Sequence, residues 1–304
     1  MKPQRIKEKI QHSRFAVHAP KPGYPPVFYY SLLFLFALSS CEEIGPSIDL
    51  AGENATDTTY VTTQIETPQT KNVLLEEFTG VRCVNCPEGH QLMDDFESLY
   101  GSRFIGISAH SEFLAEPYPG DQDLRTQDAQ DLEEFLGPIL AKPSAAIDRH
   151  LFSGESSRVH FTQKWASFVS QRMDAVTPVN IRIENDFNGR MGELKTTITL
   201  HYTAAESQDN KLSVMILEDS IIAAQLGQGN IVDSNYVHKR TLRKILTSVN
   251  GLSLTATKET GRVIVKSFRV TVPPVWKAEN LRVIALVHRS DGTMEVLQVV
   301  EQGL

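Results

Sequence analysis

Cysteine is scarce in this chain. Three of the 304 residues are cysteines: Cys41, Cys83 and Cys86. Three are too few for a small scaffold held together by several disulfides. A structural zinc site usually needs four Cys or His ligands, and no second cysteine pair stands at a matching spacing. The Cys-x-x-Cys spacing of Cys83 and Cys86 therefore favours a dithiol/disulfide couple over a metal site, and no cofactor is expected.

The chain also lacks a surplus of positive charge. It holds 30 Lys and Arg against 37 Asp and Glu, for a net charge of −7. Six of the basic residues and one acidic residue lie within residues 1–40, so removal of that segment would leave a net charge of −12. Such an acidic protein is a poor candidate for binding nucleic acid.

Long apolar runs are absent except near the N-terminus. Val27–Leu38 is an apolar run of about a dozen residues, too short to span a bilayer comfortably, and it follows a basic leader. It ends in Leu38-Ser39-Ser40-Cys41, which resembles a bacterial lipobox; the alternative is a buried helix that ends in an ordinary cysteine. We predict a lipoprotein signal peptide over residues 1–40 and a lipid anchor on Cys41. Export would place the chain where disulfides persist.

Three segments follow the predicted anchor. Residues 41–71 are polar, with apolar residues too sparse for a core, and are predicted to form a lipid-anchored tether. Residues 72–176 alternate between strand-like and helical patterns, which predicts an α/β domain. The strands are expected at 73–78 and 104–109 with a third entered near 141–148, and the helices at 88–100, 124–136 and 158–175. Strand, helix and strand in this order predict a βαβ unit with parallel strands.

Helical periodicity disappears after residue 177. Short runs rich in Val, Ile and Thr alternate with turn residues, which predicts an all-β antiparallel sandwich over residues 177–304. A long excursion at 227–246 interrupts them. The expected strands are 179–184, 194–202, 212–217, 252–257, 262–271, 281–287 and 296–299.

The cysteine pair lies where a strand meets a helix. Free backbone N–H groups and the helix dipole favour a thiolate there, so the pKa of Cys83 is expected to be low. Cys83 is then the attacking thiol, and the more buried Cys86 resolves the mixed disulfide. Pro87 is tolerated in a first helical turn.

These residues resemble the thioredoxin superfamily. The resemblance implies a catalytic trio of Cys83, Cys86 and Glu77, the last at the family's buried acid position six residues before the first cysteine. Lys142-Pro143-Ser144 resembles the family's cis-proline loop and implies substrate binding there. The chain departs from the family at Arg82, which replaces the usual tryptophan, adjoins the pair and is a further candidate for substrate binding.

A narrower resemblance covers nearly the whole chain. Residues 73–90, with the motif Cys-Val-Asn-Cys-Pro-Glu-Gly-His, and the block from Leu217 to Arg243 are similar to the twenty-eight-kilodalton outer-membrane lipoprotein family of Bacteroides- and Porphyromonas-type bacteria. The resemblance implies a protein of the outer membrane, facing the periplasm or the surface, with a thioredoxin-like domain followed by a β domain. Its biochemical role is poorly defined.

Two functions remain open. One is thiol–disulfide exchange with a protein dithiol or disulfide; the other is surface binding or adhesion, with the thioredoxin-like domain as a scaffold. A short Cys-x-x-Cys ring adds little stability through loop entropy, which favours the first. His90, one turn beyond Cys86, is interpreted as a solvated helix-face residue, with tuning of the cysteine pair as the alternative. The basic residues at 238–244 are interpreted as a salt-bridged surface.

Overall fold

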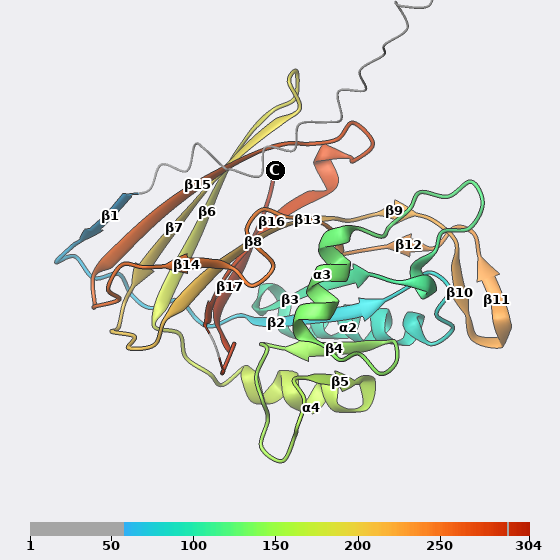
Figure 1. The fold of residues 1–304 in the computed structure, drawn as a ribbon, viewed down its shortest axis with the longest axis horizontal. Coiled ribbons are helices and arrows are strands. Elements are labelled where there is room, and N and C mark those ends of the chain that lie inside the picture. The colour runs from blue at the N-terminus through green and yellow to red at the C-terminus, as the bar shows by residue number, and fades with distance from the viewer. Residues whose placement is uncertain (1–57, 291) are drawn as a thin grey trace, which may run out of the picture. The chain divides into compact units, whose positions relative to one another are not determined.

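The computed structural model describes residues 58–290 and 292–304. Cys41, the predicted signal peptide and the first part of the predicted tether lie outside these residues. The main feature is a nine-stranded mixed sheet (Figure 1). Its strands run in the order β17 (Val296–Gly303), β16 (Leu281–Arg289), β8 (Asn210–Glu218), β13 (Thr241–Ile245), β3 (Phe104–His110), β2 (Val73–Thr79), β4 (Ser144–Ile147) and β5 (Val159–Phe161), and β14 (Leu252–Leu254) also pairs with β8.

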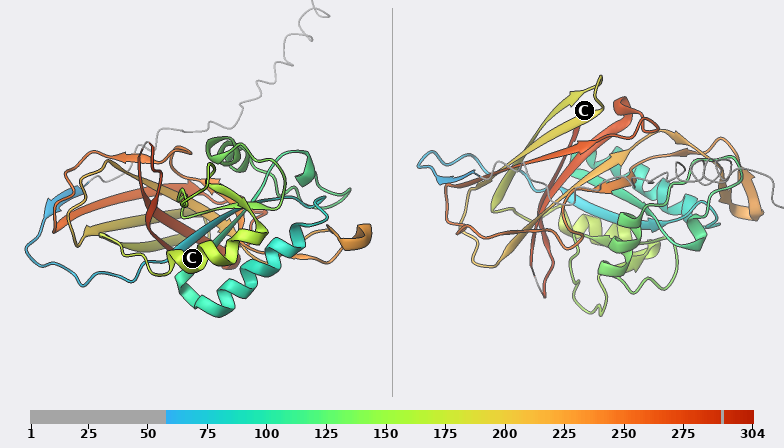
Figure 2. Two further views of the ribbon diagram at one scale, coloured as in Figure 1. Left: turned by 90° about the horizontal axis from the view of Figure 1, so that it is seen from below. Right: turned by 45° about the horizontal axis from the view of Figure 1, so that its top comes forward.

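The predicted βαβ unit is confirmed. Strands β2 and β3 are parallel, and α2 (Cys86–Tyr100) connects them. Both strands are buried along their whole length because helices cover both faces of the sheet. Figure 2 shows α2 and α4 (Thr162–Arg172) on one side and α3 (Gln127–Leu136) on the other. Within the described residues, no helix has the length and apolar character needed to cross a bilayer.

Alternate residues of β2 supply two separate apolar cores. Leu74 and Phe78 belong to the cluster that includes the buried residues of α3. Val73 and Leu75 belong to the cluster that holds α2 and α4. This alternation is the two-residue period of a strand between two helical layers. Packing on both faces holds β2 in place, and with it the turn that follows β2.

A separate antiparallel sheet lies beside the mixed sheet. Its four strands are β1 (Thr58–Val61), β15 (Arg262–Thr271), β7 (Glu193–Tyr202) and β6 (Val179–Asn188). One apolar cluster joins β6 and β7 to β8 and β16 of the large sheet, through residues such as Ile198, Val214 and Val283. The seven strands predicted after residue 177 are all present. A mixed α/β sheet and a separate antiparallel sheet are thus the observed fold class.

Strand β13 connects the two halves of the large sheet. It is parallel to β3, with Thr241 opposite Ser108, and antiparallel to β8. This strand lies inside the stretch 227–246 that was expected to be an excursion, and it was missed because Arg243 and Lys244 were interpreted as surface charge. Strands from both sides of residues 176/177 therefore share one sheet, and the division into two domains there stays a prediction.

The second half of the predicted tether is ordered against the β strands. Strand β1 pairs with β15, and the backbone N–H of Gln69 donates to the side-chain oxygen of Asn180 at 2.7 Å. The buried amine of Lys71 lies 2.5 Å from the carboxylate of Asp148. These contacts are polar and lie far apart in the sequence. The tether prediction rested on low apolar content, which does not report such contacts.

Candidate functional site

Cys83 and Cys86 form a disulfide at the start of α2, with their Cα atoms 5.3 Å apart. The backbone N–H of Cys83 donates to the carbonyl of Gly80, and that of Cys86 donates to the carbonyl of Cys83. A Cβ at Gly80 would lie 2.4 Å from the carbonyl oxygen of Leu114, so this turn requires glycine. Cys83 is 4 % exposed and Cys86 is fully buried. In the reduced protein, the helix dipole would stabilise a thiolate at this position.

Pro143 and Glu77 both meet the first turns of α2. The Lys142–Pro143 peptide bond is cis, as predicted. Gly89 follows Cys86 by three residues, and a Cβ on it would lie 3.1 Å from Cβ of Pro143 and 2.6 Å from Oε1 of Glu77. The fold therefore brings together, around one helical turn, three positions that the sequence spreads over residues 77–143.

Glu77 is a fully buried carboxyl group on β2. The hydroxyl of Ser108 donates a hydrogen bond to its Oε2 at 3.0 Å, and its Oε1 has no hydrogen-bond partner within the described chain. Burial raises the pKa of Glu77 to about 8, although the Ser108 hydrogen bond and the charge of Arg240 act to lower it. The group can therefore exchange a proton near neutral pH.

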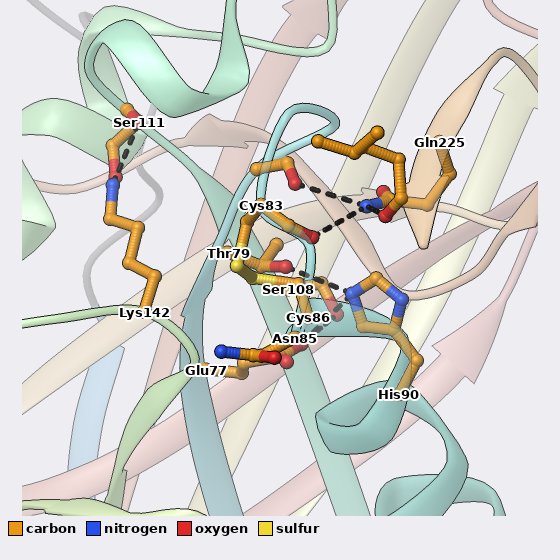
Figure 3. The surroundings of a disulfide bond; sticks show 12 residues. Glu77, Thr79, Cys83, Asn85, Cys86, His90, Ser108, Ser111, Lys142 and Gln225 are labelled. Atoms are coloured by element: carbon orange, nitrogen blue, oxygen red, sulfur yellow. Dashed lines mark hydrogen bonds and ion pairs between the residues drawn. A yellow bond between two sulfur atoms is a disulfide. The ribbon is translucent and has the colours of Figure 1, made fainter. Parts of the chain in front are cut away.

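Lys142 and Arg82, two of the predicted substrate-binding residues, are engaged elsewhere. The amine of Lys142 donates to the carbonyl of Ser111 at 2.7 Å and pairs with Glu133 at 2.9 Å, away from the disulfide (Figure 3). The guanidinium of Arg82 donates to the carbonyls of Glu116 and Pro117 and lies 4.5 Å from the Tyr118 ring centroid.

Ser144 is the third residue of the cis-proline loop, and its side chain, unlike that of Lys142, has no polar partner in the described part of the chain. Its hydroxyl is buried and has no hydrogen-bond partner within the described residues. Binding of substrate by Pro143, Lys142, Ser144 and Arg82 stays a prediction.

His90 faces the interior of the site. Its Nε2 lies 2.9 Å from the hydroxyl of Thr79 and 3.6 Å from Oε2 of Glu77 (Figure 3). Its Nδ1 lies 2.7 Å from the hydroxyl of Tyr236. Burial, together with the nearby His238 and Arg240, lowers the pKa of His90 to about 3, so the ring is neutral. The interpretation of His90 as a solvated helix-face residue was wrong.

A segment from far along the chain covers the disulfide turn. It comprises β9 (Ile221–Ile222), β10 (Gln225–Gly227), β11 (Ile231–Asp233) and β12 (Val237–His238), at the end of the sheet toward which β2 and β3 run (Figure 1). We call residues 221–238 the cover segment. The side-chain amide of Gln225 donates to the carbonyls of Gly80 and Cys83, and the N–H of Leu226 donates to the carbonyl of Val81. Sequence reasoning missed these residues because nothing local links them to the cysteines.

The Lys and Arg residues at 239–244 are paired with carboxylates, as interpreted from the sequence, but His238 has no hydrogen-bond partner within the described residues and the cluster is not the expected solvated surface. Arg240 contacts Asp94 and Glu97 of α2, and Arg243 contacts Glu218. Arg240 and Arg243 are nevertheless largely buried. No group of three or more His, Cys, Asp or Glu side chains is arranged to hold a metal ion in the part of the chain that the structure describes.

Comparison with known proteins decides the family. Residues 139–304 match the family model described as outer membrane protein Omp28. The chain belongs to the Omp28 family. It is therefore an outer membrane protein. The match includes the cis-proline loop and the cover segment, but it begins after the cysteine pair.

One solved structure shows that the fold is shared, and two others match with lower TM-scores. HBP35 of Porphyromonas gingivalis has 18% sequence identity and a TM-score of 0.61, over 79% of this chain and 77% of that one. A domain of the outer membrane lipoprotein Omp28 from the same organism also matches, with 18% identity and a TM-score of 0.30, over 43% of this chain and 90% of that one. A crystal structure from Agrobacterium tumefaciens matches with 13% identity and a TM-score of 0.46, over 77% of this chain and 95% of that one. No curated protein matches the chain.

Proposed function

We propose that this Omp28-family protein is a lipid-anchored thiol–disulfide exchange protein with a thioredoxin-like site. The observation that carries the proposal is the convergence of three features on the first turns of α2. These features are the Cys83–Cys86 disulfide, the buried carboxyl of Glu77 and the cis-bonded Pro143. An acid that titrates near neutral pH and a cis-proline loop at the same helix favour a redox role over a purely structural disulfide.

The exchange is a pair of thiolate substitutions. In the reduced protein, the thiolate of Cys83 attacks a disulfide of the partner protein, which forms a mixed disulfide and releases one partner thiolate. Cys86 then loses its proton and attacks the sulfur of Cys83. The second partner thiolate leaves, and the Cys83–Cys86 disulfide forms. Two electrons have passed to the partner; in the opposite direction, a partner dithiol reduces the pair.

The test is exchange by the full chain in detergent. Reduced protein is mixed with a disulfide-bonded substrate such as insulin, and dithiothreitol is supplied as the reductant. We expect turnover that is lost in Cys83→Ser and, when pre-reduced Cys86→Ser meets the substrate without dithiothreitol, a mixed disulfide that accumulates. Absence of both turnover and trapped adduct would overturn the proposal.

The proposed lipid anchor on Cys41 needs its own test. Cys41 follows the apolar run and the small residues of a lipobox-like sequence. Fatty acyl chains there would hold the site at the membrane surface. Cells fed labelled palmitate should label the wild type and not Cys41→Ala. Labelling of both would place the lipid elsewhere.

A second candidate function is partner binding by a non-catalytic scaffold. The observation that favours it is the low exposure of Cys83, 4 %, beneath the cover segment. A buried disulfide is poorly accessible to a folded partner. Replacement of both cysteines by alanine would leave binding and folding largely intact under this alternative, whereas it would abolish exchange under the first.

A further inference from the structure

We propose that His90 and Tyr236 form a proton path between the buried Glu77 and solvent, and that this path serves Cys86 during disulfide exchange. The proposal rests on the proposed function and adds to it two positioning residues, one of them in the cover segment.

The path is built from consecutive contacts, of which the one between Glu77 and His90 is longer than a hydrogen bond and must shorten for a proton to pass. Oε2 of Glu77 lies 3.6 Å from Nε2 of His90, and Nδ1 of the same ring lies 2.7 Å from the hydroxyl of Tyr236. The hydroxyl of Thr79 also contacts Nε2, at 2.9 Å. Glu77 is fully buried, whereas Tyr236 is only partly buried, so the contacts lead from the interior toward the surface. His90 thus contacts Glu77 through one ring nitrogen and Tyr236 through the other; Figure 3 shows His90 beside Glu77 and Thr79.

The chemistry of a neutral imidazole suits this position. One ring nitrogen carries a proton and the other accepts one, so a proton gained at Nε2 can be matched by a proton lost from Nδ1. The low pKa of His90 keeps the ring in this neutral form. The pKa of Glu77, about 8, is close to the pH at which a thiol must gain or lose a proton.

Other charged and titratable groups surround the path from several elements. Arg240 is charged and paired with two carboxylates of α2, so it holds a fixed positive charge beside Glu77 and His90. His238 and His110 lie close by, with their ring centroids 5.4 Å apart, and burial lowers the pKa of both. These rings therefore stay neutral across the range in which Glu77 titrates. The titratable and charged groups that line one pocket together with His90 are Asp94, His110, Tyr236, His238, Lys239 and Arg240.

The step itself balances in protons. When Cys86 attacks the mixed disulfide, its thiol proton passes to the carboxylate of Glu77. Glu77 passes a proton to Nε2 of His90, while Nδ1 gives its proton to the hydroxyl of Tyr236, which releases one to solvent. When the disulfide is reduced, the same path runs inward and protonates the Cys86 thiolate. The electrons move only between sulfur atoms.

The experiment follows ring closure with a small disulfide. Reduced full-length protein is mixed with oxidised glutathione, and samples are acid-quenched and weighed by mass spectrometry, which separates the Cys83–glutathione adduct from the closed disulfide. Tyr236→Phe removes only the hydroxyl, and His90→Gln keeps hydrogen bonding without a transferable proton. Tyr100→Phe, on a ring that packs against the α2 core, is the matched control.

We expect adduct formation at the wild-type rate in all variants, and closure slowed about a hundredfold in Tyr236→Phe and His90→Gln, at the low end for positioned proton transfer. Their closure should also rise steeply with pH, since hydroxide must then remove the proton directly. A purely structural role would not change the pH profile. Closure as fast in both variants as in Tyr100→Phe would overturn the path and leave the exchange function standing. Failure of the wild type to form any adduct or closed product would overturn both.

Discussion

The side-chain amide of Gln225 lies 3.1 Å from the carbonyl oxygen of Cys83, 142 positions earlier in the chain. The same amide reaches Gly80, so a single residue of the cover segment bonds to both ends of the turn that carries the first cysteine. Cys83 is 4 % exposed, so we expect a macromolecular partner to reach it only if this segment moves or the partner replaces its contacts. Access to the disulfide is therefore coupled to the stability of the cover segment.

Replacement of Gln225 by alanine tests this coupling. The change removes the buried hydrogen bonds to Cys83 and Gly80, so we expect a loss of roughly 1–3 kcal/mol of stability and faster reduction of the disulfide by dithiothreitol. The rate of reduction, followed by thiol titration, is the measurement. Gln228→Ala is the control, because the Gln228 amide bonds to Asn85 at the exposed surface. Equal rates in Gln225→Ala and the wild type would show that the segment does not limit access.

Glu77→Gln should abolish the pH dependence of stability that the buried acid creates. The folded-state pKa of Glu77, about 8, exceeds the ordinary value of 4.5. Between these two pH values, the unfolded chain releases a proton that the folded chain keeps, so the stability of the wild type falls as pH rises. Glutamine carries no such penalty. The variant should match the wild type near pH 4 and exceed it near pH 8 by several kcal/mol, because each pH step of one between the two pKa values contributes about 1.4 kcal/mol.

Urea unfolding of the oxidised proteins at pH 4, 6 and 8 measures this difference. The disulfide must stay intact so that thiol titration does not contribute. A constant difference between wild type and Glu77→Gln at the three pH values would show that Glu77 does not titrate in this range.

Gly89→Ala adds only one carbon atom, yet it should damage the site. In an exposed helix this change would stabilise by roughly 1 kcal/mol. Here the new Cβ would lie 2.6 Å from Oε1 of Glu77 and 3.1 Å from both Pro143 and Trp165, and overpacking costs roughly 1–3 kcal/mol. We expect a net loss of stability and slower exchange, measured by urea unfolding and insulin reduction. Gly303→Ala, with open space around its Cβ, is the control. A stabilised Gly89→Ala would contradict the close approach.

Sequence reasoning succeeded where the signal was local. The apolar periods of 73–78 and 88–100 predict β2 and α2, and the resemblance to the thioredoxin superfamily points to Glu77 as the buried acid. It failed where polar contacts join distant segments. Nothing near Tyr236 or Gln225 indicates that they bond to His90 and Cys83, which precede them by 146 and 142 positions. Strand β13 was missed because the charged pair Arg243 and Lys244 interrupts the apolar pattern by which a strand is recognised.

Glu76 and Arg149 give a last prediction on the same strand as Glu77. The guanidinium of Arg149 bonds to both carboxylate oxygens of Glu76, at 2.9 and 2.7 Å, and neither side chain is exposed. Loss of one partner leaves a buried, unpaired charge, so Arg149→Met should cost about 3–5 kcal/mol. The double variant Arg149→Met/Glu76→Leu removes both charges and should recover much of this loss.

The surface provides the matched control for this pair. Arg269 and Glu193 pair at 2.6 Å with side chains 49% and 29% exposed, and Arg269→Met should cost less than about 1 kcal/mol because water screens the interaction. Urea unfolding of the four variants and the wild type, with Glu76→Leu completing the cycle, gives the coupling energy. A coupling below about 1 kcal/mol, the size expected of a surface pair, would mean that water or a shifted side chain compensates the buried charge. A large coupling would show that this ion pair fixes β2 against the loop that follows β4, and thereby holds Glu77 and the cis-proline loop in place.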